Sequence, residues 1–292
     1  MRLVWPTFTL ALLAALPPVP GGAQANRDAV WDSVASVLQT GVTSAAGYYR
    51  YNLPRRDLHL RLGDVEVAAS MALGAWAGFS GDAQHATVMG DLVLTGAELG
   101  PVLAELSRRD ISVTAIHNHL VGADPQVAYV HFHAEGSAVQ LARRLASAVA
   151  LTATPLPVAD APPQPVSIDT ASVFRAFGPG RAQGAVAQVS LVLIPGTVTL
   201  HGHGVVPTLG YGTPINIQAV TAERAVATGD FAVLGTQVDP VLDALAANRI
   251  TATAVHSHLI GESPTVYYIH FWADASLDVV LGGLRAAVDA AR

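Results

Sequence analysis

The sequence predicts an α+β protein of two tandem homologous repeats, each an antiparallel sheet with helices on one face. Three observations support this fold class. Residues 90–135 and 229–274 align without a gap at an offset of 139, and 20 of the 46 pairs are identical. In both copies the spacing of apolar residues follows the order β-α-β-β-α. The segment 153–168, which contains five prolines, lies between the copies and is typical of a linker.

The N-terminus resembles a secretory signal peptide. Arg2 gives the positive start, residues 3–16 are apolar, and residues 23–25 fit a small-residue cleavage site. The apolar stretch is shorter than the about 20 residues that span a bilayer, although an uncleaved anchor is the alternative. We therefore expect an exported protein, periplasmic or extracellular, without a stable membrane span after cleavage. The predicted organisation is a signal peptide at 1–25, a first repeat at 26–152, a linker at 153–168 and a second repeat at 169–292.

Apolar periodicity and turn residues place the elements in order. The first repeat opens with a helix at 28–38, where Asp28 is the expected cap, and continues with strands at 48–51, 57–62 and 65–69. Its core is predicted as a strand at 91–94, a helix at 98–108, strands at 111–120 and 127–134, and a helix at 137–150. The second repeat has a helix at 169–177, strands at 185–193 and 197–200, and core elements at 230–234, 238–247, 250–259, 266–273 and 277–291.

Residue usage excludes several classes of protein. The chain has no Cys, which excludes disulfides, a lipid-modified cysteine and a thiol nucleophile. It has no Lys, and neither a Gly-x-Ser-x-Gly elbow nor a His-Glu-x-x-His zinc motif is present. The net charge of −6 argues against nucleic acid as a partner, because such partners are bound by basic surfaces. The oligomeric state is not predicted.

A histidine pattern occurs once in each repeat. It consists of His-x-His, a loop with Gly and Pro, and Tyr-x-His-Phe. A tight hairpin centred on Ala123 would place His117 opposite Tyr129 and Ala115 opposite His131, so that His117 and His131 become diagonal neighbours on one face. The candidate metal ligands are therefore His117, His119, His131, His256, His258 and His270.

Three neutral imidazoles suit a transition metal, with Zn or Cu expected, and leave a coordination position open. The two triads predict either two separate sites or one shared site, if the uncovered sheet faces dock against each other. A metal-dependent hydrolase or oxidase of the cell envelope is one alternative. A module that binds a cell-wall or other small ligand without metal is another, and purely structural histidines are a third.

Other residues are candidates for ligand binding beside these triads. His133 and its counterpart Trp272 extend the histidine strands, and Tyr129 and Tyr268 lie within them, although core packing is the favoured interpretation of both tyrosines. His201 and His203 form a further His-x-His, which the surrounding glycines indicate to be a loop. We expect Asp91 and Asp230 to bind local backbone in turns, with orientation of a histidine as the alternative. Glu135 and Asp274 are expected to cap the last helix of each repeat.

The mature chain resembles the LppY/LpqO family of exported bacterial proteins. The stretches that carry the resemblance are VMGDLVLTGAELGPVLAEL, VTAIHNHLVGADPQVAYVHFH, GDFAVLGTQVDPVLDAL and TAVHSHLIGESPTVYYIHFWA. The resemblance implies an extracytoplasmic protein of two tandem repeats and implies no particular activity. Some members resemble lipoproteins, but this chain lacks the cysteine that a lipid anchor needs.

Overall fold

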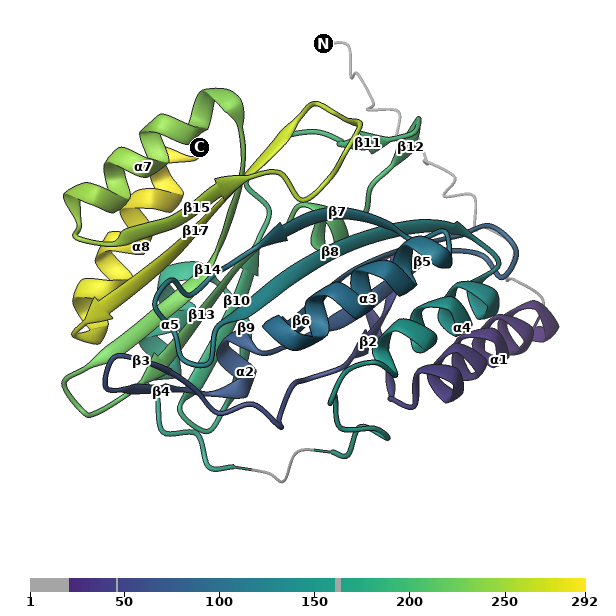
Figure 1. Ribbon diagram of the computed structural model, residues 1–292. Coiled ribbons are helices and arrows are strands. Elements are labelled where there is room, and N and C mark those ends of the chain that lie inside the picture. Colours follow the sequence, from purple (N-terminus) through teal and green to yellow (C-terminus); the bar gives the residue numbers. More distant parts are fainter. Residues whose placement is uncertain (1–20, 46, 161–163) are drawn as a thin grey trace, which may run out of the picture.

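The structure is a computed structural model that describes residues 21–45, 47–160 and 164–292. It contains two six-stranded antiparallel sheets with helices on the outer face of each (Figure 1), which confirms the predicted fold class. Residues 1–20 of the predicted signal peptide lie outside the described residues, so export stays a prediction. Within the described ranges, no helix is both long enough and apolar enough to cross a membrane.

The first sheet has the strand order β1-β2-β5-β6-β8-β7. Its strands are β1 (Val42–Ala45), β2 (Tyr48–Asn52), β5 (Trp76–Gly81), β6 (Ala86–Thr95), β7 (Ser112–His117) and β8 (Val127–Gly136). The helices on its outer face are α1 (Gly21–Leu38), α3 (Gly96–Arg108) and α4 (Ala138–Val149). Helix α1 begins at Gly21 and not near the expected cap at residue 28. Helix α3 starts where Glu98 accepts a hydrogen bond from the Thr95 N–H over 2.8 Å.

The second sheet repeats this order as β15-β17-β14-β13-β10-β9. Its strands are β9 (Gly180–Gln183), β10 (Val186–Leu191), β13 (Thr213–Ala219), β14 (Ala225–Leu234), β15 (Thr251–His256) and β17 (Val266–Ala275). The elements outside it are α5 (Thr170–Phe177), the 3-10 turn η1 (Gly235–Gln237), α7 (Val238–Ala247) and α8 (Leu277–Ala290). In both sheets the strand that carries His-x-His therefore lies at an edge.

The sequence pattern did not predict β5 or its counterpart β13. Strand β5 reads WAGFSG, which lacks a regular alternation of polar and apolar residues. Its Gly78 has a packing reason, because a Cβ there would lie 2.3 Å from Cδ1 of Leu209 in the other repeat. The contact between the repeats thus requires glycine at position 78, and glycine weakens the sequence pattern that predicts a strand.

Each repeat places a hairpin and a short helix against the sheet of the other. The hairpin of β3 (Leu60–Leu62) and β4 (Val65–Val67) leads into α2 (Ala69–Ala72), which lies against β13 and β10. The side chain of Gln218 in β13 binds the backbone of Glu66 and Ala68, each over 2.8 Å. In return, β11 (Thr199–Leu200) and β12 (His203–Gly204) lead into α6 (Pro207–Gly210), which contacts β6. β11 also pairs with the short strand β16 (Glu262–Ser263).

A buried apolar cluster fills the space between the inner faces of the sheets. It combines Tyr48 and Met89 of the first repeat with Leu209, Tyr211 and Tyr268 of the second. Burial of this apolar surface holds the inner faces together at a fixed distance. Histidines lie next to this cluster, since its Tyr268 stacks on His258.

The first part of the predicted linker packs against the first repeat. The N–H of Val158 donates to the carbonyl of Gln39 over 2.8 Å, and the N–H of Ala153 donates to Glu98 over 2.8 Å. Leu156 and Val158 also contact the core of that repeat. This stretch therefore adds to the first repeat instead of acting only as a spacer.

Candidate metal centre

The histidine strands pair as the sequence predicts. In the first repeat Ala115 pairs with His131 and His117 pairs with Tyr129. The second repeat has both pairs at the equivalent positions. His117 and His131 are therefore diagonal neighbours on the same face of the sheet, and their ring centroids lie 5.1 Å apart.

The second histidine of each His-x-His pair lies beyond the end of its strand. We expected one strand over residues 111–120, but β7 ends at His117 and His119 belongs to the following loop. The side chain of Asn118 accepts a hydrogen bond from the N–H of Leu120 over 2.8 Å, which turns the chain. The second repeat ends its strand at the equivalent position. The predicted strands were thus too long, but the turn still directs the second ring towards the first.

Six imidazole rings form one cluster between the repeats: His117, His119, His131, His256, His258 and His270. The centroids of the His117 and His256 rings lie 4.2 Å apart. His119 lies 3.8 Å from His270, and the equivalent pair, His131 and His258, lies 3.7 Å apart. Each close pair joins one ring from each repeat, so the cluster follows the pseudo-two-fold symmetry of the chain. The two triads meet in one shared cluster instead of lying apart.

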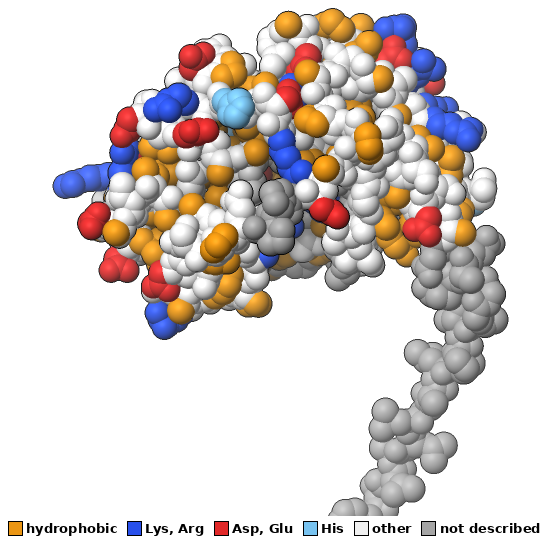
Figure 2. Space-filling model, turned by 90° about the horizontal axis from the view of Figure 1, so that it is seen from below, with side chains coloured by type: hydrophobic (Ala, Val, Ile, Leu, Met, Phe, Trp, Pro, Cys, Tyr) orange, Lys and Arg blue, Asp and Glu red, His pale blue; other side chains and the backbone are white. Residues whose placement is uncertain are grey.

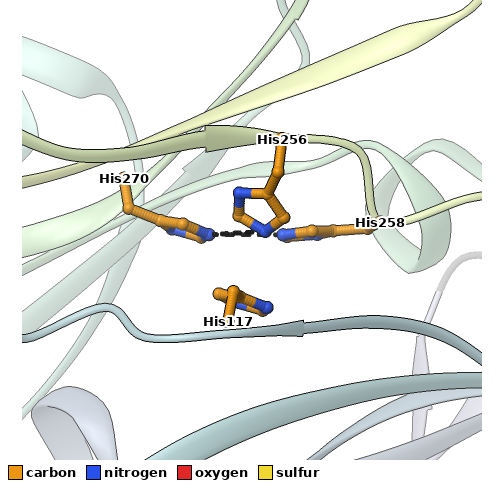
Figure 3. Close-up of side chains that lie close together, drawn as sticks. All are labelled: His117, His256, His258 and His270. Carbon is orange, nitrogen blue, oxygen red and sulfur yellow. Dashed lines mark hydrogen bonds between the residues drawn. The ribbon is translucent and has the colours of Figure 1, made fainter.

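Three ring nitrogens of the second repeat converge within this cluster (Figure 3). The Nε2 atom of His270 lies 3.3 Å from the Nε2 atoms of both His256 and His258. His117 approaches from β7 of the other repeat, and one nitrogen from each of these four residues lies within 4.8 Å of the other three. Tetrahedral ligands about 2.0–2.1 Å from a zinc ion would lie about 3.3–3.4 Å from one another. The distances from Nε2 of His270 to its two neighbours therefore match the edge of such a site.

Several nitrogens in the cluster lack a hydrogen-bond partner. Both ring nitrogens of His117 are buried without one, as are the Nε2 atoms of His119 and His131. Leaving a buried polar atom unsatisfied costs about 1–3 kcal/mol. A metal ion that accepts several nitrogen lone pairs, or a group that donates several hydrogen bonds, would satisfy these nitrogens.

One buried carboxyl lies beside the third histidine of each repeat: Asp230 beside His270, and Asp91 beside His131. The Oδ1 atom of Asp230 lies 2.6 Å from Nδ1 of His270, on the side of the ring away from the converging Nε2 atoms. In the first repeat, Oδ2 of Asp91 lies 3.9 Å from Nε2 of His131. We expected both aspartates to bind backbone in turns, but they lie within β14 and β6. The hydrogen-bond partner of His270 Nδ1 is the carbonyl of Gly229, over 3.4 Å, and the Asp230 carboxylate lies beside the same nitrogen. Nε2 of the ring therefore faces the cluster, in agreement with the alternative role considered for these residues.

Burial and mutual repulsion lower the pKa values of five imidazoles in the cluster and keep these rings neutral. Burial, followed by repulsion from neighbouring histidines, lowers the pKa of His131 to about 3 and that of His256 to about 4. The same causes hold the pKa values of His117, His119 and His258 well below the ordinary value. Burial, followed by repulsion from Asp230, raises the pKa of the Asp91 carboxyl well above its usual value. Neutral imidazoles expose the lone pairs that bind metals, so the cluster is prepared for a cation.

Both candidate tyrosines support the cluster from behind. Tyr129 stacks near His119, with ring centroids 3.9 Å apart, and Tyr268 stacks on His258 at 3.6 Å. Each hydroxyl is engaged, because Tyr129 donates to the carbonyl of Ala72 over 2.9 Å and Tyr268 donates to the carbonyl of Gly210. The tyrosines are buried and hold the histidine rings in place, as their favoured interpretation as packing residues predicts.

The remaining candidates do not belong to the cluster of six rings. His133, Glu135 and His201 form a separate group, whose ligand atoms all lie within 4.8 Å of one another. His203 is exposed in β12. Trp272 takes the place of His133 in the second repeat and packs against the core of the first. The expectation that Glu135 and Asp274 cap helices was wrong, because the N-caps of α4 and α8 are Ser137 and Ser276.

Comparison with known proteins identifies the domain. A family model described as Domain of Unknown Function (DUF1259) matches residues 32–151 and again residues 173–290. The chain therefore belongs to this family and carries its domain twice. The family description does not include the LppY/LpqO name, so that resemblance stays a prediction. A comparison with curated proteins finds no match.

Two solved structures have low overall similarity to the chain. The double ringed trimeric shell protein MSM0271 from the RMM microcompartment has 10% identity and a TM-score of 0.21, over 73% of this chain and 85% of that one. EtuB from Clostridium kluyveri has 14% identity and a TM-score of 0.22, over 86% of this chain and 89% of that one. Scores at this level support no argument about fold or function.

Proposed function

We propose that this protein, with its two DUF1259 domains, binds a transition-metal ion at the histidine cluster between its repeats. The proposed ligands are the Nε2 atoms of His256, His258 and His270, with His117 of the other repeat as the fourth residue. The observation that carries this proposal is the 3.3 Å spacing between the Nε2 atoms of His270 and its two neighbours. Both contacts have the geometry of hydrogen bonds, and their length equals the distance between neighbouring ligands of a tetrahedral zinc ion.

Zinc and copper are the proposed ions. Imidazole nitrogens suit both metals, whereas Mg²⁺ and Ca²⁺ prefer oxygen ligands. The contact of His270 Nδ1 with the Gly229 carbonyl, over 3.4 Å, supports the proposal, because histidine ligands of metals usually donate their second N–H to a carbonyl or carboxylate, and Asp230 lies beside the same nitrogen. Neutral imidazoles support it as well, because no proton has to leave before the ion binds.

The burial of the cluster favours an ion over an organic ligand. His270 is fully buried and His258 is 5% exposed. A groove for a cell-wall fragment would need to expose its polar groups to a molecule many atoms long. We therefore prefer the binding of an ion to the small-ligand alternative. We propose that the binding takes place outside the cytoplasm, in agreement with the signal-like N-terminus.

Elemental analysis of protein purified without a histidine tag tests the proposal. The protein is stripped with chelator, loaded separately with Zn²⁺ or Cu²⁺, desalted and analysed for metal per chain. We expect the double variant His256→Ala/His258→Ala to lose the tightly held ion. The control is His59→Ala/His85→Ala, because the side chains of these two histidines are 84% and 86% exposed and lie outside the cluster. A wild-type protein that retains neither metal would overturn the proposal.

The same samples separate binding from catalysis. Tight metal retention without turnover on envelope substrates supports a binding protein. Turnover of an envelope substrate that disappears with the metal would instead identify the hydrolase or oxidase alternative.

A further inference from the structure

A second group of metal-ligating side chains lies near the buried centre but is more open to solvent. His133 and Glu135 lie on β8, and His201 lies in the turn between β11 and β12 of the other repeat. The Oε1 atom of Glu135 lies 3.5 Å from Nε2 of His133 and 3.3 Å from Nδ1 of His201. Strand and turn thus bring two imidazoles and one carboxylate from both repeats to one point.

The group has a buried nitrogen without a partner. His133 is 8% exposed, and its Nε2 atom has no hydrogen-bond partner. A cavity of about 20 Å³ beside it is lined by His133, Glu135 and His203. A space of that size holds about one water molecule. The buried nitrogen, the carboxylate and the cavity form a partly enclosed site.

The equivalent place in the pseudo-symmetric half is closed by ion pairs. The offset of 139 relates His133 and Glu135 to Trp272 and Asp274. It relates His201 to Leu62, and the neighbouring His203 to Asp64. There, Arg224 binds Asp274 and Asp64 at 2.7 and 2.6 Å. One half thus satisfies its carboxylates permanently with a guanidinium. The other half has imidazoles around its carboxylate, and imidazoles leave lone pairs free for a metal.

The turn that presents His201 has an unusual backbone. His201 has a φ of 51°, a left-handed conformation that costs free energy for most side chains other than Gly, Asn and Asp. It keeps this conformation beside Gly202, whose φ is 83°. Strained residues of this kind concentrate at functional positions, and here the strained residue contacts Glu135.

We propose that His133, Glu135 and His201 form a second transition-metal site with a Zn²⁺-like ion as its ligand. Two histidines and one glutamate are a known ligand set for zinc, and they leave one position for water. The cavity beside His133 provides the space for that water. Because the side chains of Glu135 and His201 are 45% and 55% exposed, the ion exchanges with solvent more readily than one in the buried centre.

The site goes beyond the proposed function, since none of its residues belongs to the six-histidine cluster. It lies close to that cluster, however. His133 and His131 are two residues apart on β8 and on the same face of the strand, a distance of about 6.7 Å along the backbone. An ion at the outer site thus lies one strand step from the buried centre.

Zn²⁺ titration of the full-length, chelator-stripped protein tests the proposal. We expect Glu135→Gln/His201→Asn to bind one Zn²⁺ fewer per chain than the wild type. Asn is chosen at position 201 because it tolerates a positive φ and preserves the turn. The control is His59→Ala, which removes a more exposed histidine and is expected to leave the count unchanged. Circular dichroism verifies that the variants are folded.

A second titration separates this proposal from the first. In the background His256→Ala/His258→Ala, one Zn²⁺ is expected to remain, to be removed by brief treatment with a weak chelator, and to disappear when Glu135→Gln/His201→Asn is added. If Glu135→Gln/His201→Asn binds as much Zn²⁺ as the wild type in both backgrounds, the outer site does not exist. Glu135→Gln/His201→Asn could lower the number of Zn²⁺ ions bound per chain while His256→Ala/His258→Ala leaves it unchanged. In that case this proposal stands and the proposed function fails.

Discussion

His117 and His256 occupy the same position in the two repeats and face each other with ring centroids 4.2 Å apart. Each lies at the end of an edge strand, β7 or β15. The contact means that neither repeat contains the whole cluster. The properties of the centre therefore depend on residues from both halves of the chain.

A first prediction follows for variants in either half. His117→Ala/His119→Ala should lower Zn²⁺ affinity at least tenfold even though three proposed ligands lie in the other repeat, because His117 supplies the fourth nitrogen. His256→Ala/His258→Ala should abolish tight binding. Titration with a competing chelator measures both. Two independent sites would instead give a loss of half the metal with each pair, and that result would contradict a shared centre.

Asp230 provides a second prediction. Its carboxylate contacts the far side of His270, so Asp230→Asn should weaken metal binding about 10–100-fold while leaving the fold intact. Asp91→Asn is the matched control, because the Asp91 carboxyl lies 3.9 Å from His131 and its raised pKa favours the neutral form that Asn imitates. Equal losses in both variants would argue against a special role for Asp230.

The stability of the metal-free protein should depend on pH. His131 and His256 have pKa values of about 3 and 4 in the folded protein, against about 6.5 in an unfolded chain. Below pH 6.5 the unfolded chain therefore binds protons that the folded protein does not, and the free energy of unfolding falls as the pH drops towards 4. Thermal unfolding in the presence of chelator should show a melting temperature that declines over this interval. His256→Gln should reduce the slope, and an unchanged melting temperature from pH 7 to pH 4.5 would contradict the prediction.

Gly229 gives a fourth prediction, which concerns the fold. A Cβ at this position would lie 2.0 Å from the carbonyl oxygen of Pro214 on the neighbouring strand. Gly229→Ala should therefore destabilise the protein, by about 1–3 kcal/mol, since backbone must move. Gly100 in α3 is the control, because no atom lies within 4 Å of its Cβ position, and Gly100→Ala should stabilise by about 0.5–1 kcal/mol. Urea unfolding measures both, and an equal effect of the two changes would refute the argument.

Much of the fold was predictable because its signals are local. The duplication, the alternation in β8 and β17, and the pairing of His117 with Tyr129 all follow from residues close in sequence. The length of β7 was overestimated, because the side chain of Asn118 ends the strand and a pattern of alternating residues does not reveal that hydrogen bond. Strand β5 was missed because its Gly78 serves a contact with Leu209, far away in the sequence.

The site was predictable in its residue types but not in its assembly. The repeated pattern identified the six histidines, and the paired Gly-Asp motifs offered a signal for Asp91 and Asp230. That signal was assigned to turns because β6 and β14 begin earlier than predicted. The meeting of both triads depends on the docking of two sheets, which is controlled by apolar packing between distant residues such as Met89 and Tyr268.

The charge on one face of the molecule agrees with the acidic composition. Figure 2 shows both acidic and basic side chains on that face, with several basic side chains gathered at its upper right.

The exchange of α2 and α6 between the halves has a consequence for the origin of the chain. Because a short helix of each half covers the sheet of the other half, a single copy would expose apolar surface on its own sheet to solvent. An ancestor encoding one copy would have had to associate with an identical partner, with the precursors of His117 and His256 meeting on the symmetry axis. Fusion of the two genes would then have allowed each half to diverge. One half now has Arg224 between its carboxylates, and the other has His133 and His201 around Glu135.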